Sequence, residues 1–133
     1  MEEDVIIKVS PDKEKAKNLF KMIQSILERI ENSNKKKFTS LIVSDYYEII
    51  KELITAILIS TGIKTLSHKK LIEQTKEFKE INEKEYYLMD ELRIIRNKIN
   101  YDGFFVEYDY LERKERDIKT VIKKLSKILQ DNI

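Results

Sequence analysis

The scarcity of glycine and proline is the feature that most constrains the fold of this chain. In 133 residues Gly occurs twice and Pro once. Chains built of strands and tight turns need many more turn-forming residues, so this composition favours long helices joined by short connections. Cysteine is absent. The chain therefore has no disulfide, no thiol nucleophile and no Cys-ligated zinc.

Apolar residues recur at helical spacing along most of the chain, and they predict five helices. These are expected after Ser10-Pro11-Asp12 to about residue 31, from about Thr39 to Thr61 with Gly62 following, from His68 to about Glu80, from about Glu83 to Asn100 and from about Tyr108 to Gln130. The second is apolar on most sides, which is typical of a central or interface helix. The sequence thus predicts one all-α domain over residues 1–133, an antiparallel bundle of four to five helices.

Local signals mark two helix starts. Ser10 is expected to be the N-cap of the first helix, with Pro11 at its first position. Ser67 is expected to cap the third helix. Residues 1–9 are expected to form a flexible or loosely packed lead-in.

The net charge and the hydropathy of the chain limit which partners and which cellular location we expect. Charged residues make up 38% of the chain, but the net charge is only +2, which does not by itself imply nucleic-acid binding. No secretory-signal pattern is present, and the longest apolar-rich stretch is broken by charges, so we expect a cytoplasmic protein without membrane contact. One His and two isolated Gly residues favour neither a metal site nor a Gly-rich phosphate loop, and we expect no cofactor.

The fourth expected helix carries the most unusual polar pattern. An apolar stripe runs beside a polar one; the first holds Leu88, Leu92, Ile95 and Ile99, and the second Arg93, Arg96, Asn97 and Asn100. Two guanidinium groups and two amides on one flank suit a phosphate or carboxylate, because guanidinium offers paired donors and keeps its charge. The alternative is that these side chains pair with acids on neighbouring helices.

The end of that helix resembles a known motif. Arg96-Asn97-Lys98-Ile99-Asn100-Tyr101 resembles the motif of the HEPN family, in which Arg, often followed by a polar residue, precedes His by four to six residues near a helix end. Residues 46–53 with Gly62 resemble that family's second helix, and residues 65–71 its link into the third. The resemblance implies a helical bundle that dimerises, here through the second and fourth helices, so that the two motifs meet across the two-fold axis.

The resemblance also implies a chemistry. In active HEPN proteins the paired motifs form a metal-independent ribonuclease site, where Arg holds the scissile phosphate and His assists attack by the ribose 2′-hydroxyl. Other members are toxins beside a nucleotidyltransferase partner, or binding modules. By this resemblance Arg96 matches the motif Arg, Asn97 matches the polar residue and Tyr101 stands in the place of the His.

The Tyr at this position changes the expected activity. A phenol ionises near pH 10 and an imidazole near 6.5, so Tyr is a poor general base at neutral pH. We therefore expect an RNA- or nucleotide-binding protein of a defence or toxin–antitoxin-like system, with weakened or lost ribonuclease activity. The alternatives are a residually active endoribonuclease that uses Arg96 and Tyr101, and a non-catalytic assembly module. In a binding protein, Tyr101 would bind the ligand or stack on it. The structural alternative is that Tyr101 closes the end of the helix as an aromatic plug.

Three more residues have a structural interpretation. His68 follows the expected N-cap, where the helix dipole disfavours its charged form, and it is expected to tie the link between the second and third helices to a backbone group. Tyr46 and Tyr47 are expected to pack in the core or in a dimer contact.

Overall fold

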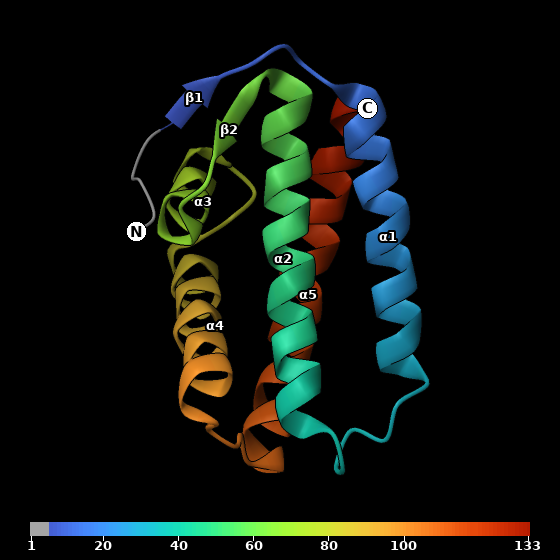
Figure 1. The fold of residues 1–133 in the computed structure, drawn as a ribbon, viewed down its shortest axis with the longest axis vertical. Helices are drawn as coiled ribbons and strands as arrows, with labels where there is room; N and C mark the ends of the chain where they lie inside the picture. The colour runs from blue at the N-terminus through green and yellow to red at the C-terminus, as the bar shows by residue number, and fades with distance from the viewer. Residues whose placement is uncertain (1–5) are drawn as a thin grey trace.

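The computed structural model describes residues 6–133, and these form the predicted all-α bundle (Figure 1). Its helices are α1 (Lys13–Glu31), α2 (Thr39–Thr61), α3 (His68–Gln74), α4 (Glu83–Asp102) and α5 (Tyr108–Asn132), with a 3-10 turn at Thr75–Glu77 and two short strands, β1 (Ile6–Lys8) and β2 (Ile63–Thr65). No helix in this part of the chain has both the length and the apolar composition to cross a bilayer.

Helix α2 is the centre of the bundle, as its apolar sequence predicts. Its core residues, including Tyr46, Tyr47, Ile50 and Leu53, are fully buried. Helices α1 and α4 lie on either side of it and α5 lies behind it (Figure 1). The four long helices alternate in direction along the chain, because α1 and α4 run in one direction and α2 and α5 in the other (Figure 1). The pair α2 and α5, by contrast, is parallel.

Helix α1 begins at Lys13, and its N-cap is Asp12 rather than Ser10. The Asp12 carboxylate accepts a hydrogen bond from the Lys15 amide at 2.9 Å. The backbone N–H of Asp12 donates to the carbonyl of Ile59 at 2.9 Å, which holds the residue before the helix against the end of α2. Asp12 is thus fixed outside the helix by a tertiary contact, and the prediction that Ser10 caps it is wrong.

A two-stranded ribbon closes the same end of the bundle. Strand β1 pairs with β2 in antiparallel register, with Ile6 opposite Thr65 and Lys8 opposite Ile63. The predicted lead-in falls partly outside the described residues, since these begin at residue 6. For Ile6–Lys8 the structure corrects it to an exposed but paired strand.

The later helix ends also differ from the predicted ones. Helix α3 stops at Gln74 and passes through the 3-10 turn to Phe78, whose backbone is extended, so it ends before the predicted Glu80. Ser67 caps it as predicted, accepting a hydrogen bond from the Lys70 amide at 3.2 Å. Helix α4 continues to Asp102 and ends at Gly103, which has a left-handed φ of 63°.

Candidate functional site

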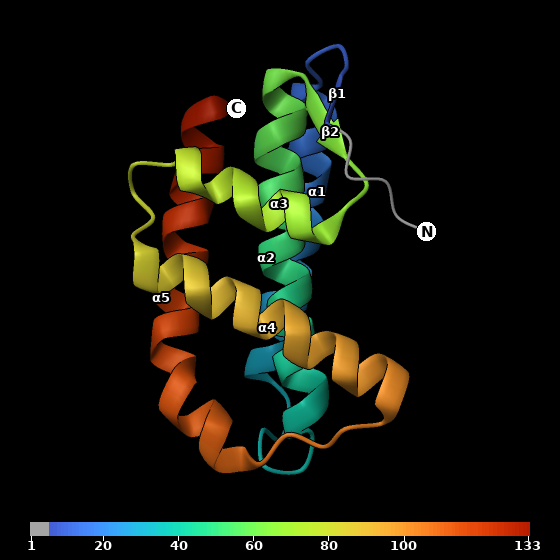
Figure 2. The same ribbon diagram turned by 90° about the vertical axis from the view of Figure 1, so that its left-hand side faces the viewer.

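Helix α4 carries the predicted polar stripe, and its N-terminus is fixed by a capping box. The Asn82 side chain accepts from the Glu85 amide at 2.8 Å, and the Glu85 carboxylate accepts from the Asn82 amide at 3.0 Å. Leu88 and Leu92 are buried and Ile95 and Ile99 are partly buried, so the predicted apolar stripe does face the core. Figure 2 shows α4 running obliquely across α2, with its C-terminal turns projecting beyond the bundle.

Arg96 lies against the ring of Tyr47, a fully buried residue of α2. The guanidinium carbon is 6.0 Å from the ring centroid, within the range of a cation–π contact. The Arg96 side chain is half-buried, and no carboxylate in residues 6–133 lies within ion-pair distance of it. Arg96 thus places a permanent positive charge against the aromatic ring of Tyr47.

His68 reaches the same tyrosine from the start of α3. Its Nδ1 is 3.3 Å from the Tyr47 hydroxyl, and the two ring centroids are 6.0 Å apart. Tyr47 therefore joins α2, α3 and α4, and it brings the imidazole and the Arg96 guanidinium to one side chain. From the sequence we expect Tyr47 to pack in the core or in a dimer contact and His68 to bind a backbone group. Neither expectation includes the contacts among Tyr47, His68 and Arg96.

The other predicted site residues are arranged differently from Arg96. Arg93 donates from Nε to the Asp90 carboxylate at 2.9 Å, so its acid lies one turn away on α4 and not on a neighbouring helix. Asn97 is half-buried and Asn100 is exposed. Tyr101 is 79% exposed, which excludes the aromatic plug. Arg96 and Asn97 are thus both half-buried, and Arg93 is paired with Asp90.

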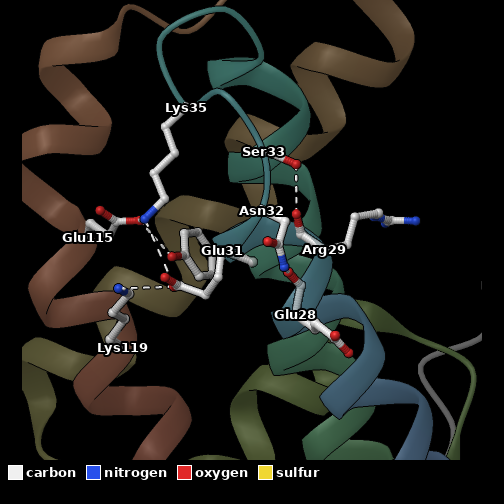
Figure 3. Close-up of polar contacts among 9 residues, drawn as sticks. Glu28, Arg29, Glu31, Asn32, Ser33, Lys35, Glu115 and Lys119 are labelled. Atoms are coloured by element: carbon white, nitrogen blue, oxygen red, sulfur yellow. Dashed lines mark hydrogen bonds and ion pairs between the residues drawn. The ribbon is translucent and has the colours of Figure 1, made fainter.

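A second polar network lies between α2 and α5 (Figure 3). The Tyr46 hydroxyl donates to Glu115 at 2.6 Å, and the Lys35 ammonium lies 3.0 Å from the same carboxylate oxygen. Glu31 accepts ion pairs from Lys119 at 3.3 Å and from Lys35 at 3.9 Å. This network ties the connection between α1 and α2 to α5, and it is structural because a buried tyrosine and opposed charges satisfy one another within it.

Burial, together with the hydrogen bonds and charges of this network, shifts the pKa values of Tyr46 and Glu115. Burial, followed by the hydrogen bond to the Glu115 carboxylate, raises the pKa of the Tyr46 hydroxyl far above its usual value. Partial burial works to raise the pKa of Glu115, but the hydrogen bonds from Tyr46 and Lys35 and the charges of Lys35 and Lys119 outweigh it and lower that pKa. Tyr46 therefore stays a neutral donor and Glu115 an ionised acceptor.

In the described part of the chain no group of three or more His, Cys, Asp or Glu residues is placed to hold a metal ion. Comparison of the chain with protein-family models, curated proteins and solved structures finds no match. The resemblance to the HEPN family therefore stays a prediction, which rests on the residues of α2, α3 and α4 that carry it.

Proposed function

We propose that this protein binds RNA through the C-terminal half of α4, with Arg96 as the group that holds a phosphate. In this proposal it is a HEPN-like dimer of a defence or toxin–antitoxin-like system, with a nucleotidyltransferase as its partner protein, and its ribonuclease activity is weak or absent. The observation that carries the proposal is the Arg96 guanidinium, which is half-buried and has no carboxylate within ion-pair distance in residues 6–133.

The physical case depends on that missing counter-charge. A partly desolvated guanidinium interacts more strongly with an anion than a fully hydrated one, and its planar fork can bind a phosphate through two hydrogen bonds. The Tyr47 ring below it limits the positions it can take. Asn97, the next residue of α4, is half-buried and belongs to the same polar stripe. Arg93 is already paired with Asp90 and contributes less to anion binding.

Weak catalysis follows from the surroundings of Tyr101. The side chain is 79% exposed, and no described residue forms a side-chain hydrogen bond with it that would orient it as an acid or base. One observation favours a second candidate function, a residually active metal-independent endoribonuclease. His68, the only histidine of the chain, contacts the same tyrosine as Arg96 and could supply the imidazole that the motif lacks.

The proposed dimer uses the second and fourth helices. Helix α2 is flanked by α1 and α4 and has α5 behind it, and no other helix lies on its remaining side (Figure 1). The C-terminal turns of α4 project towards that side in the perpendicular view (Figure 2). Two copies that meet there would bring two Arg96 side chains to one groove, as the HEPN resemblance implies.

The test is binding and cleavage of a labelled single-stranded RNA in EDTA at one fixed salt concentration, because phosphate contacts depend steeply on salt. We expect binding without efficient cleavage, and a loss of about tenfold or more in affinity for Arg96→Ala. The matched control is Arg93→Ala, which removes an arginine that already has an acidic partner and should change affinity much less.

Each other result has a definite meaning. Cleavage that persists in EDTA and disappears in His68→Asn would favour the second candidate function. Equal losses for the two arginine variants would show that only overall charge matters. A folded wild-type protein that neither binds nor cleaves RNA would overturn the proposal and favour an assembly role.

A further inference from the structure

The end of the bundle opposite the strands exposes four aromatic rings and one leucine. We call it the aromatic end and define it by five exposed residues: Phe38, Leu41, Tyr101, Phe104 and Phe105. Phe105 is 83% exposed and is the most exposed of them. The link that carries Phe104 and Phe105 passes beneath the N-terminal end of α2 on its way to α5 (Figure 2). Single exposed apolar residues are ordinary, but Phe38, Leu41 and Phe105 line one hollow, and apolar side chains grouped in this way mark a binding surface.

The aromatic end is held in place by specific contacts. The Val106 amide donates to the Ser40 hydroxyl at 2.8 Å, and the Val106 side chain is buried, so the link is fixed to the start of α2. The Phe104 amide donates to the Lys98 carbonyl at 3.2 Å, which closes the C-terminus of α4. Beside them lies a hollow of about 470 Å³, whose lining includes Lys37, Phe38, Leu41 and Phe105. The rings are thus presented by an ordered surface.

Two lysines lie against rings of the aromatic end and a third lies against a ring beside the same hollow, and their charges are not neutralised by ion pairs. The ammonium of Lys98 is 5.9 Å from the Phe104 ring centroid, and that of Lys37 is 5.5 Å from the Phe38 centroid. Lys36 lies 5.5 Å from the ring of Tyr108, the first residue of α5. None of the three forms an ion pair within residues 6–133. The acids on the same link are Asp102 and Glu107, both exposed.

We infer that the aromatic end is a stacking platform for unpaired bases of single-stranded RNA, with its lysines directed at the phosphates. The inference rests on the proposed function, because the same strand would bind Arg96. Arg96 and Tyr101 are about 8 Å apart along the axis of α4, a distance that a single strand readily covers. Exposed rings beside cations are the arrangement that binds single strands without regard to sequence.

The charges favour RNA over a protein partner. Lysine is depleted from the centre of protein–protein contacts, whereas a polyanion gains from each ammonium group that it meets. An aromatic face can stack on any base, so the rings and the lysines would bind different parts of one strand.

The experiment distinguishes binding to the bases of the RNA from binding to its phosphates. The probes are a labelled oligoadenylate about ten nucleotides long and an abasic oligomer of the same length and charge. Wild type should bind the oligoadenylate more tightly. Phe105→Ala and Phe104→Ala should each weaken oligoadenylate binding by about tenfold and leave binding of the abasic oligomer unchanged. Tyr87→Ala is the control, since Tyr87 is an exposed aromatic residue near the other end of α4.

The outcomes distinguish this inference from the proposed function. Arg96→Ala should weaken the binding of both probes. If it does so while Phe105→Ala binds oligoadenylate as wild type does, the platform is disproved and the phosphate site stands. If wild type binds neither probe, both fail. If Phe105→Ala, with a wild-type circular dichroism spectrum, changes only the sedimentation mass, the aromatic end is a protein contact and the inference is overturned.

Discussion

Tyr46 and Tyr47 are adjacent residues of α2 with different surroundings. Successive residues of a helix point about 100° apart, so two neighbouring side chains can serve two different contacts. Tyr46 donates to Glu115 of α5, whereas Tyr47 contacts His68 of α3 and Arg96 of α4. One turn of the central helix therefore both connects the bundle and supports the candidate site.

The two glycines provide a matched pair of substitutions. Both have positive φ, 89° for Gly62 and 63° for Gly103. A Cβ at Gly62 would lie 2.7 Å from the Val9 carbonyl oxygen, whereas nothing lies within 4 Å of one at Gly103. We expect Gly103→Ala to lower the free energy of unfolding by about 1 kcal/mol, the cost of the left-handed backbone alone. Gly62→Ala should cost about 3 kcal/mol, because the clash is added.

Urea denaturation of both variants measures this difference. Each glycine ends a different helix, so each single variant reports its own loss in free energy of unfolding. Equal losses for the two would mean that the Val9 carbonyl moves aside without cost.

At the scale of elements, the capping box of α4 makes a local prediction. Asn82→Ala removes the acceptor of the Glu85 amide and should lower the free energy of unfolding by about 1 kcal/mol. Glu85 also binds Lys124 of α5 at 2.9 Å, so the first turn of α4 is held by a second contact. We expect faster amide exchange in that turn and unchanged exchange in its last turn. Faster exchange along all of α4 would show that the whole helix depends on the cap.

The sequence predicts most helix bounds because local signals specify them. Gly62 ends α2, and Ser67 caps α3, as predicted. The start of α1 is mispredicted because Ser10 and Asp12 are both good N-caps, and the contact with Ile59 decides between them. The ribbon is not predicted because a strand of three residues has no measurable periodicity, and its partner is distant in the chain.

The candidate site is predictable only in part. The polar stripe of α4 follows from its spacing, and the pairing of Arg93 with Asp90 could have been found from the same spacing, since residues three apart are neighbours on a helix. The cluster of Arg96, Tyr47 and His68 could not, because it needs side chains from three helices whose relative placement is a tertiary property.

At the scale of the whole molecule, the proposed dimer makes a prediction about Ile94. This residue is an exposed apolar side chain on the C-terminal half of α4. If α2 and α4 form the dimer contact, Ile94→Lys places two like charges near the two-fold axis, and sedimentation should show a monomer. Met22→Lys, at an exposed apolar residue of α1, is the control. A dimer that survives Ile94→Lys would place the contact elsewhere.

The lowered pKa of Glu115 predicts how stability depends on acid. A carboxyl whose folded pKa lies below its usual value of 4.5 stabilises the fold above that pH, and this stabilisation is lost as pH falls through the folded pKa. Glu115→Gln should therefore destabilise the protein at about pH 7, and the difference from wild type should shrink at about pH 3. Glu112→Gln, at an exposed residue of α5, is the control for both measurements by urea denaturation.

The raised pKa of Tyr46 predicts the alkaline behaviour. A hydroxyl whose folded pKa lies above its usual value of 10.0 stabilises the fold fully below that pH, and the stabilisation is lost as pH rises above it. Wild type should therefore lose stability above about pH 10, and Tyr46→Phe should lose less over the same range. A wild-type loss that the variant reproduces in full would assign it to other groups.

The pairing of β1 with β2 also has a consequence for the order of events during synthesis. Ile6 bonds in register with Thr65, and Asp12 is held by Ile59, so both contacts wait until the ribosome has released the far end of α2. Helix α1 can form early from its own sequence, but its N-terminal end has no place to dock until then. A pause in translation before β2 would leave this end of the nascent chain unanchored, while a pause after β2 would not.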